Sequence, residues 1–368
     1  DIDKQFVIQQ IQARQLLKKK LPSWSENDEL LFPKRLSLEQ CSSELTAKYK
    51  RTISRRDEEA QCNISENQCR SVGEKRTISR RVAESQSRDA SMAPAIKHID
   101  TSLHRILVDL TGGMGVDTSF LSDNFDETIY VEAQEELCEL ARHNFKILNK
   151  NIEVVNAKAE DFLSQCDNVD CIYLDPARRD EYGRKMVSLH DCSPDVAELQ
   201  DLIFEKSNTL IVKLSPMLDI DIIKKELKNI KEIHVVAVKN ECKEVLVKSA
   251  RQRDSETTSR DASMIPAIKR IDTSDDNEAI RRLYISAIDL KENWKFSFTE
   301  DEEQNAIPTF ADEIGKYLYE PGVACMKAAP FRLLSQRFNI KKLHRNSHLY
   351  TSDELVTDFP GRIFEVIN

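Results

Sequence analysis

One stretch of the chain sets the expected architecture: Ile106-Leu107-Val108-Asp109-Leu110-Thr111-Gly112-Gly113-Met114-Gly115-Val116-Asp117. Its apolar start, 106–108, predicts a buried parallel strand. Three glycines then fall within four positions, in a chain that has eight glycines over 368 residues. Glycine permits positive φ and lets a ligand approach the backbone closely. With a helix predicted from residue 118, the stretch is typical of the first unit of a nucleotide-type α/β site. A tight turn without a ligand is the alternative.

A second predicted strand, 128–131, ends in an acidic residue, Glu132. This residue follows the glycine loop by about twenty residues, a spacing that suits the two ribose hydroxyls of a nucleotide. The loop itself matches neither G-x-G-x-x-G nor the P-loop pattern, and no lysine follows it to hold a phosphate. An NAD-dependent oxidoreductase is therefore disfavoured.

A later strand, 171–174, runs into Asp175-Pro176-Ala177-Arg178-Arg179. A carboxylate at this strand end can accept a hydrogen bond from an exocyclic amine, and proline stiffens the loop that presents it. Arg178 can stack by its guanidinium plane or bind phosphate. The alternative is that both arginines pair with surface acids.

The remaining strand predictions complete an α/β fold. Strands are predicted at 152–155, 209–214, 232–238 and 244–248, with helices between most of them. Only residues 239–243 separate the last two strands, so the final strand is expected to be antiparallel. The fold class is thus α/β, with a Rossmann-like sheet of seven strands and a last strand that runs against the others.

Three segments carry a family resemblance: Leu21-Pro22-Ser23-Trp24, the run from Leu36 to Glu44, and the D-x-T-G-G-x-G-x-D pattern of 109–117. Together they resemble a bacterial, Bacteroidetes-type family of class I methyltransferases that use S-adenosyl-L-methionine (SAM) and end in a THUMP-like domain. The resemblance implies a class I methyltransferase sheet, an N-terminal helical piece and a small C-terminal α+β domain. It implies methyl transfer to RNA, on a tRNA or rRNA base.

The resemblance also implies roles for individual residues. SAM would be bound through its methionine part, its ribose and its adenine by Asp109, Thr111, Gly112, Gly113, Gly115, Asp117, Glu132, Glu160 and Asp161. Asp175, Pro176 and Arg178 would face the acceptor, and Arg179 would bind the substrate. The family of base methyltransferases carries an aromatic residue after the Asp-Pro-x part, whereas this chain has arginine, which argues against N6-adenine methylation.

Composition and charge limit the other classes of protein to which this chain could belong. The formal net charge of −9 gives no global nucleic-acid footprint, although a local basic face stays open. No run of about eighteen apolar residues predicts a membrane span, and no signal-peptide pattern is found. Nine cysteines without C-x-x-C spacing favour reduced thiols over disulfides or zinc. We expect a cytoplasmic protein without a metal site.

Domain boundaries follow from shifts in composition. We expect an N-terminal helical region at 1–50, a methyltransferase domain at 103–249 and a THUMP-like domain at 281–368. The chain starts at Asp1, so an N-terminal piece is expected to be missing. Two inserts, 51–102 and 250–280, carry near-identical copies of one sequence, 87–102 and 259–274. They lack a core pattern and are predicted to be disordered, with a basic RNA-binding arm as the alternative.

The C-terminal domain has a local density of basic residues. Candidates to bind substrate phosphates are Lys327, Lys341, Lys342, His344 and Arg345. A solvated helix face explains the same residues equally well. Two other functions stay open: a methyltransferase of a protein or small molecule, and a SAM-binding, non-catalytic RNA-binding protein.

Overall fold

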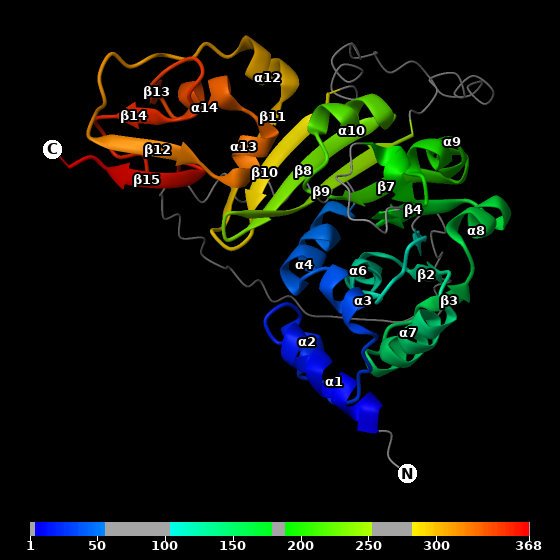
Figure 1. Ribbon diagram of the computed structural model, residues 1–368. Helices are drawn as coiled ribbons and strands as arrows, with labels where there is room; N and C mark the ends of the chain where they lie inside the picture. Colours follow the sequence, from blue (N-terminus) through cyan, green and yellow to red (C-terminus); the bar gives the residue numbers. More distant parts are fainter. Residues whose placement is uncertain (1–3, 56–103, 179–187, 252–281, 368) are drawn as a thin grey trace, which may run out of the picture.

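The computed structural model describes residues 4–55, 104–178, 188–251 and 282–367 (Figure 1). Its centre is a nine-stranded sheet with the strand order β11-β10-β8-β9-β7-β4-β1-β2-β3. The bounds of these strands are β1 (Ile106–Asp109), β2 (Glu127–Glu132), β3 (Glu153–Asn156), β4 (Val169–Leu174), β7 (Ser207–Leu214), β8 (Ile230–Val238), β9 (Glu241–Ala250), β10 (Tyr284–Asp289) and β11 (Trp294–Thr299).

Seven of these strands form the predicted Rossmann-like sheet. The strands β3, β2, β1, β4 and β7 are parallel neighbours. Strand β9 inserts between β7 and β8 and is antiparallel to both, which confirms the expected direction of the last strand. A hairpin explains the reversal, because Lys239 and Asn240 connect β8 to β9 with φ values of 55° and 57°. Positive φ at both turn residues is typical of a type I′ turn.

We expected the two strands predicted at 283–290 and 294–298 to open the C-terminal domain. They belong to the large sheet instead. Strand β10 pairs in parallel with β8, and β11 pairs with β10 in the antiparallel direction, so both extend the large sheet. Their inward side chains, Ile285 and Ala287 on β10 and Phe296 on β11, join the same hydrophobic cluster as the sheet. The edge of β8 is thereby covered rather than left unpaired.

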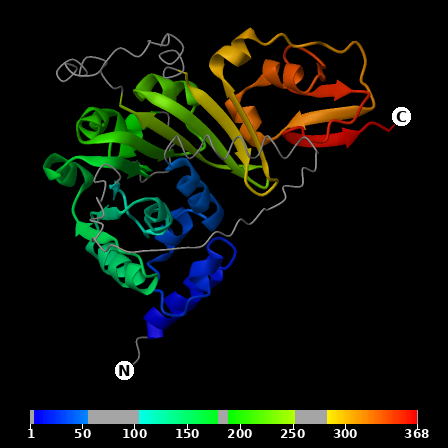
Figure 2. The same ribbon diagram turned by 180° about the vertical axis from the view of Figure 1, so that it is seen from behind.

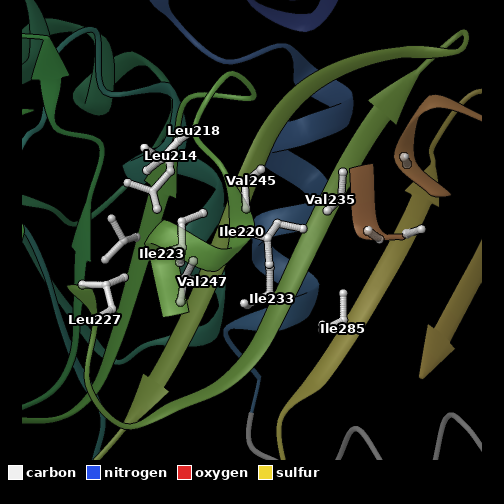
Figure 3. Packing of buried hydrophobic residues seen from close by; sticks show 14 of the residues in the cluster. Leu214, Leu218, Ile220, Ile223, Leu227, Ile233, Val235, Val245, Val247 and Ile285 are labelled. Atoms are coloured by element: carbon white, nitrogen blue, oxygen red, sulfur yellow. The ribbon is translucent and has the colours of Figure 1, made fainter. Parts of the chain in front are cut away.

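Helices cover both faces of the sheet. One face packs against α8 (Ala159–Gln165), α9 (Val196–Lys206), α10 (Ile220–Glu226) and α13 (Val323–Ala328). Figure 3 shows Ile220 and Ile223 of α10 lying over Val245, Val247 and Ile233. The other face packs against α6 (Val116–Leu121), α7 (Glu135–Ile147) and α4 (Glu44–Ile53).

The N-terminal region contains α1 (Lys4–Leu17), α2 (Pro22–Ser25), α3 (Arg35–Gln40) and α4 (Glu44–Ile53). Helix α4 runs three residues past the predicted boundary at 50. Leu17, Trp24 and Leu38 of this region share a hydrophobic cluster with Met114 and Val116 of the glycine loop. The region is therefore packed against the glycine loop and against α6 and α7, on one side of the molecule (Figure 2).

The C-terminal part is a small α+β unit, as expected. Its sheet has the order β13-β14-β12-β15. The elements are α12 (Glu300–Asn305), β12 (Tyr317–Pro321), α13, α14 (Phe331–Arg337), β13 (Lys341–Lys342), β14 (Tyr350–Ser352) and β15 (Gly361–Glu365). Tyr319, Tyr350 and Phe359 fill its centre.

Two predictions fall mainly outside the described residues. The inserts at 51–102 and 250–280 are described only at 51–55 and 250–251.

Across the described ranges, no helix is long and apolar enough to cross a membrane.

A buried ion pair fastens α4 to the sheet. The Lys50 side chain has no exposed surface, and its Nζ donates hydrogen bonds to Glu244 Oε2 at 2.9 Å and to Ser42 Oγ at 2.9 Å. The same Nζ lies 3.3 Å from Asp117 Oδ1. Lys50 thus neutralises one carboxylate from β9 and one from α6, so three distant segments depend on one cation.

Removing this cation should be costly. Lys50→Met should lower the free energy of unfolding by about 3–5 kcal/mol, because two buried carboxylates lose their partner. Adding Glu244→Gln should recover part of that loss, since one unpaired charge disappears. The control is Lys48→Met on the same helix. The Lys48 side chain is 53% exposed, and Glu44 keeps the Ser23 N–H, so the loss should be less than about 1 kcal/mol. Urea denaturation measures all three. Equal effects of Lys50→Met and Lys48→Met would contradict the assignment.

Candidate active site

A cavity of about 720 Å³ opens at the carboxyl ends of β1, β2 and β4. This is the edge at which open α/β sheets bind ligands. The lining residues come from the N-terminal region, the glycine loop, the ends of the strands and the first turn of α8. They are Ser37, Gln40, Cys41, Ser42, Asp109–Asp117, Glu132, Ala133, Gln134, Leu137, Ala157–Asp161, Tyr173, Asp175, Ala177, Ser193 and Pro194.

The glycine loop needs its glycines. A Cβ on Gly112 would lie 2.2 Å from the ring of Tyr130, so any side chain there collides with β2. Gly113 and Gly115 adopt φ values of 54° and 78°, which other residues rarely adopt. The Tyr130 hydroxyl donates a hydrogen bond to the Gly113 carbonyl at 2.6 Å. The loop is thus held flat against the aromatic ring, with its other side toward the cavity.

Asp109 lies under this loop and is almost fully buried. Its Oδ1 accepts the Thr111 N–H at 3.0 Å, and its Oδ2 accepts the Thr118 hydroxyl at 2.5 Å. Burial raises the pKa of Asp109 to about 7, although the hydrogen bonds from Thr118 and Thr111 act in the opposite direction. Through these two hydrogen bonds, Asp109 connects Thr111, which precedes the glycines, to Thr118, which follows them.

Glu132 ties the end of β2 to the glycine loop. Its Oε2 accepts the Gly113 N–H at 2.9 Å, and its Oε1 accepts the Gln134 N–H at 2.9 Å. The side chain is half-buried and lines the cavity. Two backbone donors thus fix the orientation of the carboxylate, and each oxygen keeps lone-pair capacity.

Asp117 lies at the back of the cavity, and 8% of its surface is exposed. Its Oδ2 accepts hydrogen bonds from Ser42 Oγ at 2.7 Å and from the Tyr173 hydroxyl at 2.7 Å. Burial alone would raise the pKa of Asp117, but Lys50 and Lys213 outweigh it, so the pKa is lowered. Protein donors thus occupy Oδ2, whereas the buried Oδ1 accepts no hydrogen bond from the described residues and lies 3.3 Å from Lys50 Nζ.

Asp175 stands at the end of β4, with about a third of its side chain exposed. Its N–H donates to Thr111 Oγ1 at 2.6 Å, which joins the ends of β1 and β4. Its Oδ2 forms an ion pair with Lys213 of β7. Burial alone would lower the pKa of Lys213, but Asp175, followed by Asp117 and Glu244, raises it. The carboxylate is thus held from one side, with its other side toward the cavity.

The residues after Asp175 form a short strand. Pro176 is half-buried, and the backbone of Arg178 in β5 (Ala177–Arg178) pairs with Cys192 in β6 (Cys192–Ser193). Arg179 lies outside the described residues. Ala177, Ser193 and Pro194 line the cavity beyond Asp175.

Glu160 and Asp161 occupy the first turn of α8 and are exposed at the cavity mouth. Lys158 precedes them as the N-cap residue of α8 and lines the same wall. Both predicted acids therefore lie in the cavity wall, shortly after the end of β3.

The basic residues predicted to bind phosphates in the C-terminal domain do not form one exposed surface. None of its members lines the cavity. Lys342 is 4% exposed, and its Nζ lies 5.8 Å from the centre of the Phe331 ring. Lys327 donates to the Leu218 carbonyl at 2.7 Å. Only Lys341, His344 and Arg345 are exposed to a ligand.

Sequence reasoning missed several residues of the site. Lys213 was included in a predicted strand without a role, although a lysine near the end of an apolar strand is a recognisable signal. Ser37, Gln40, Cys41 and Ser42 belong to a segment that carried the family resemblance and were not predicted as site residues, yet all four line the cavity.

His190, Asp195 and Glu198 bring three ligand atoms within 4.8 Å of one another. Protein hydrogen bonds account for this grouping. Asp195 Oδ2 pairs with His190 Nδ1 at 2.9 Å, and Oδ1 accepts the Glu198 N–H at the start of α9. The bond to Asp195 raises the pKa of His190. We assign no metal here.

Strand order and site together define the class of Rossmann-like methyltransferases. The chain is similar to the crystal structure of a protein assigned as a methyltransferase from Porphyromonas gingivalis W83, with 30% sequence identity and a TM-score of 0.73. The match covers 100% of this chain and 76% of that chain. The protein therefore belongs to that methyltransferase family.

A model of a ferredoxin-like domain matches residues 317–360. This match describes the C-terminal unit as ferredoxin-like and leaves the THUMP-like assignment as a prediction. More distant structures include an rRNA methylase from Streptococcus thermophilus, at 15% identity and a TM-score of 0.31, covering 41% of this chain and 89% of that one. The N-terminal domain of human METTL16, in complex with S-adenosylhomocysteine (SAH), matches at 12% identity and a TM-score of 0.32. This match covers 41% of this chain and 63% of that one. Both are too distant to inform on the reaction of this chain. No curated protein matches it.

Asp109 predicts a pH dependence of stability. An acid whose pKa is about 7 when folded and about 4 when unfolded binds more protons in the folded state, so stability falls as pH rises between these values. Asp109→Asn has no such titration. The free energy of unfolding of the wild type, relative to this variant, should therefore fall between about pH 4 and about pH 7. Urea denaturation at several pH values measures it. A relative stability that stays constant or rises would contradict the assignment.

Proposed function

We propose that this protein transfers a methyl group from SAM to a nitrogen atom of an RNA base, in tRNA or rRNA. The observation that carries the proposal is the cavity whose floor is the glycine loop and whose walls include Glu132 and Asp175. Its volume of about 720 Å³ lies in the range of cofactor sites, about 300–1,000 Å³. Family membership supports the reaction type.

The residues present fit SAM. Glu132 has lone pairs for the ribose hydroxyls while it keeps Gly113 and Gln134. Glu160 and Asp161 stand at the end of the cavity that would receive the adenine. The bare glycine backbone leaves room for the methionine part above Gly112–Gly115. When bound, SAM supplies a methyl group on a sulfonium, which is an electrophile.

Asp175 would position the acceptor. The side of its carboxylate not paired with Lys213 can accept an N–H of the acceptor amine, which aims the nitrogen lone pair at the methyl group. Lys213 holds the carboxylate in orientation and places a positive charge beside it. The rate enhancement would come mainly from this alignment of nucleophile and electrophile.

The support for RNA comes from outside the cavity. Lys341, His344 and Arg345 form an exposed group on the C-terminal domain that could bind phosphates, and Arg178 follows the acceptor carboxylate. We keep a THUMP-like role in RNA capture for this domain as part of the proposal.

One observation favours a different acceptor. Among the described residues that line the cavity, Tyr173 is the only aromatic one, and its hydroxyl is bound to Asp117. A flipped base is usually stacked between flat or apolar side chains. A protein or small-molecule amine is therefore the second candidate.

Glu132→Ala should lower the affinity for SAM and for S-adenosylhomocysteine (SAH) by about tenfold or more, since a charged hydrogen-bond partner of the ribose is lost. The matched control is Glu135→Ala, a nearby exposed glutamate of α7 that does not line the cavity. It should bind like the wild type. Isothermal titration calorimetry measures both. No binding by the wild type would disprove the cofactor assignment.

Asp175→Asn should reduce methyl transfer by about a hundredfold or more, because the carboxylate that orients the acceptor is lost. SAH affinity should change little. The assay follows label from methyl-labelled SAM into total tRNA, rRNA, protein and small-molecule fractions. Label in a protein or small-molecule fraction would support the second candidate. SAH binding without transfer to any fraction would point to a non-catalytic RNA-binding protein.

A further inference from the structure

The N-terminal region supplies a wall of the cavity that sequence reasoning gave no role. Ser37, Gln40, Cys41 and Ser42 line it, where the last turn of α3 leads to the start of α4. We call residues 37–42 the cover segment. It comes from a part of the chain about seventy residues before the glycine loop, so no local motif predicts it.

The cover segment is fixed beside the glycine loop. Leu38 shares a hydrophobic cluster with Met114 and Val116, the residues that flank Gly115. Ser42 Oγ donates to Asp117 Oδ2 at 2.7 Å. These contacts place the segment at the glycine-loop end of the cavity, where the proposed function puts the methionine part of SAM.

Lys20 holds the cover segment from behind. Its Nζ donates to the Leu38 carbonyl at 3.0 Å and to the Glu39 carbonyl at 2.6 Å. Both carbonyls belong to the last turn of α3, so the lysine caps that helix end. A positive charge next to the segment also favours an anionic group in the cavity.

The glycine loop has little hydrogen-bonding capacity left for a carboxylate. The Gly112 N–H donates to the Val131 carbonyl at 2.9 Å, and the Gly115 N–H donates to the Gly112 carbonyl at 2.8 Å. The Gly113 N–H is bound to Glu132. All three glycine donors are therefore taken by the protein, and the methionine carboxylate needs donors from elsewhere.

The cover segment has such donors. Within the described residues, neither the Ser37 hydroxyl nor the Gln40 side-chain amide has a hydrogen-bond partner, and both line the cavity. The Ser42 hydroxyl is already bound to Asp117. Burial raises the pKa of the Cys41 thiol, so the neighbour of Gln40 stays neutral and does not repel an anion.

We propose that Ser37 and Gln40 bind the α-carboxylate of the methionine part of SAM, and that the N-terminal region is thereby a part of the cofactor site. The inference rests on the proposed function, because it needs SAM in this cavity. It adds two specificity-determining residues, which select ligands that carry the amino-acid part.

The test compares two ligands that differ in this part. SAH carries the amino-acid part, whereas 5′-methylthioadenosine keeps the adenosine and the thioether and lacks it. Calorimetry on the full chain with Ser37→Ala/Gln40→Ala should show SAH affinity reduced by about tenfold, as expected for the loss of hydrogen bonds to a charged group. The affinity for 5′-methylthioadenosine should stay within about twofold of the wild type.

Two further variants sharpen the result. Glu39→Ala is the matched control, since Glu39 is exposed beside Gln40, does not line the cavity and binds Lys20 through its backbone. It should leave both affinities unchanged. Gln40→Glu should lower the SAH affinity more than the alanine double variant does, because the new carboxylate repels the carboxylate of SAH. The affinity for 5′-methylthioadenosine should again stay near that of the wild type.

The outcomes separate the two proposals. An equal loss for both ligands, or no loss for SAH, overturns the role of Ser37 and Gln40 while the wild type and Glu132→Ala still establish the cofactor. If the wild type binds neither ligand, the proposed function fails, and this inference fails with it.

Discussion

The structure depends on a set of charges beneath the cavity, all of them buried or largely buried except Asp175, which is partly exposed. Lys50 pairs with Glu244 and lies beside Asp117, while Lys213 pairs with Asp175. Taking charges out of water is favourable only when the partners are held in good geometry. Helix α4, the glycine-loop helix α6 and three strand segments supply those partners. The requirement to neutralise each charge therefore fixes how the N-terminal region, the loop and the acceptor residue stand relative to one another.

Local patterns in the sequence predicted much of the fold. Apolar runs that end in Asp109, Glu132 and Asp175 predicted both the strands and the cavity edge, because the carboxyl ends of parallel strands meet. The glycine cluster predicted a tight loop, and its positive φ values agree. A hairpin with only five residues between two predicted strands was enough to predict the reversed last strand.

Long-range pairing limited the rest. Ser42 and Asp117 are 75 residues apart, and Lys50 and Glu244 are 194 residues apart. No spacing rule encodes such contacts. Strand β10 was misplaced because the pattern of a strand does not tell which edge it joins. Lys342 was misjudged since its basic character says nothing of burial, and the aromatic rings of Phe331 and Tyr350 cover it.

The way β10 and α13 join the large sheet has a consequence for substrate choice. Helix α13 lies beside β10 (Figure 1). Ala324 and Cys325 of α13 belong to the same hydrophobic cluster as Ile285 and Ala287 of β10. A continuous hydrophobic core, rather than a hinge, therefore links the ferredoxin-like unit to the sheet that bears the cavity. If the C-terminal unit binds the substrate, as we propose, its fixed distance from the cavity sets the minimum length of a substrate that contacts both.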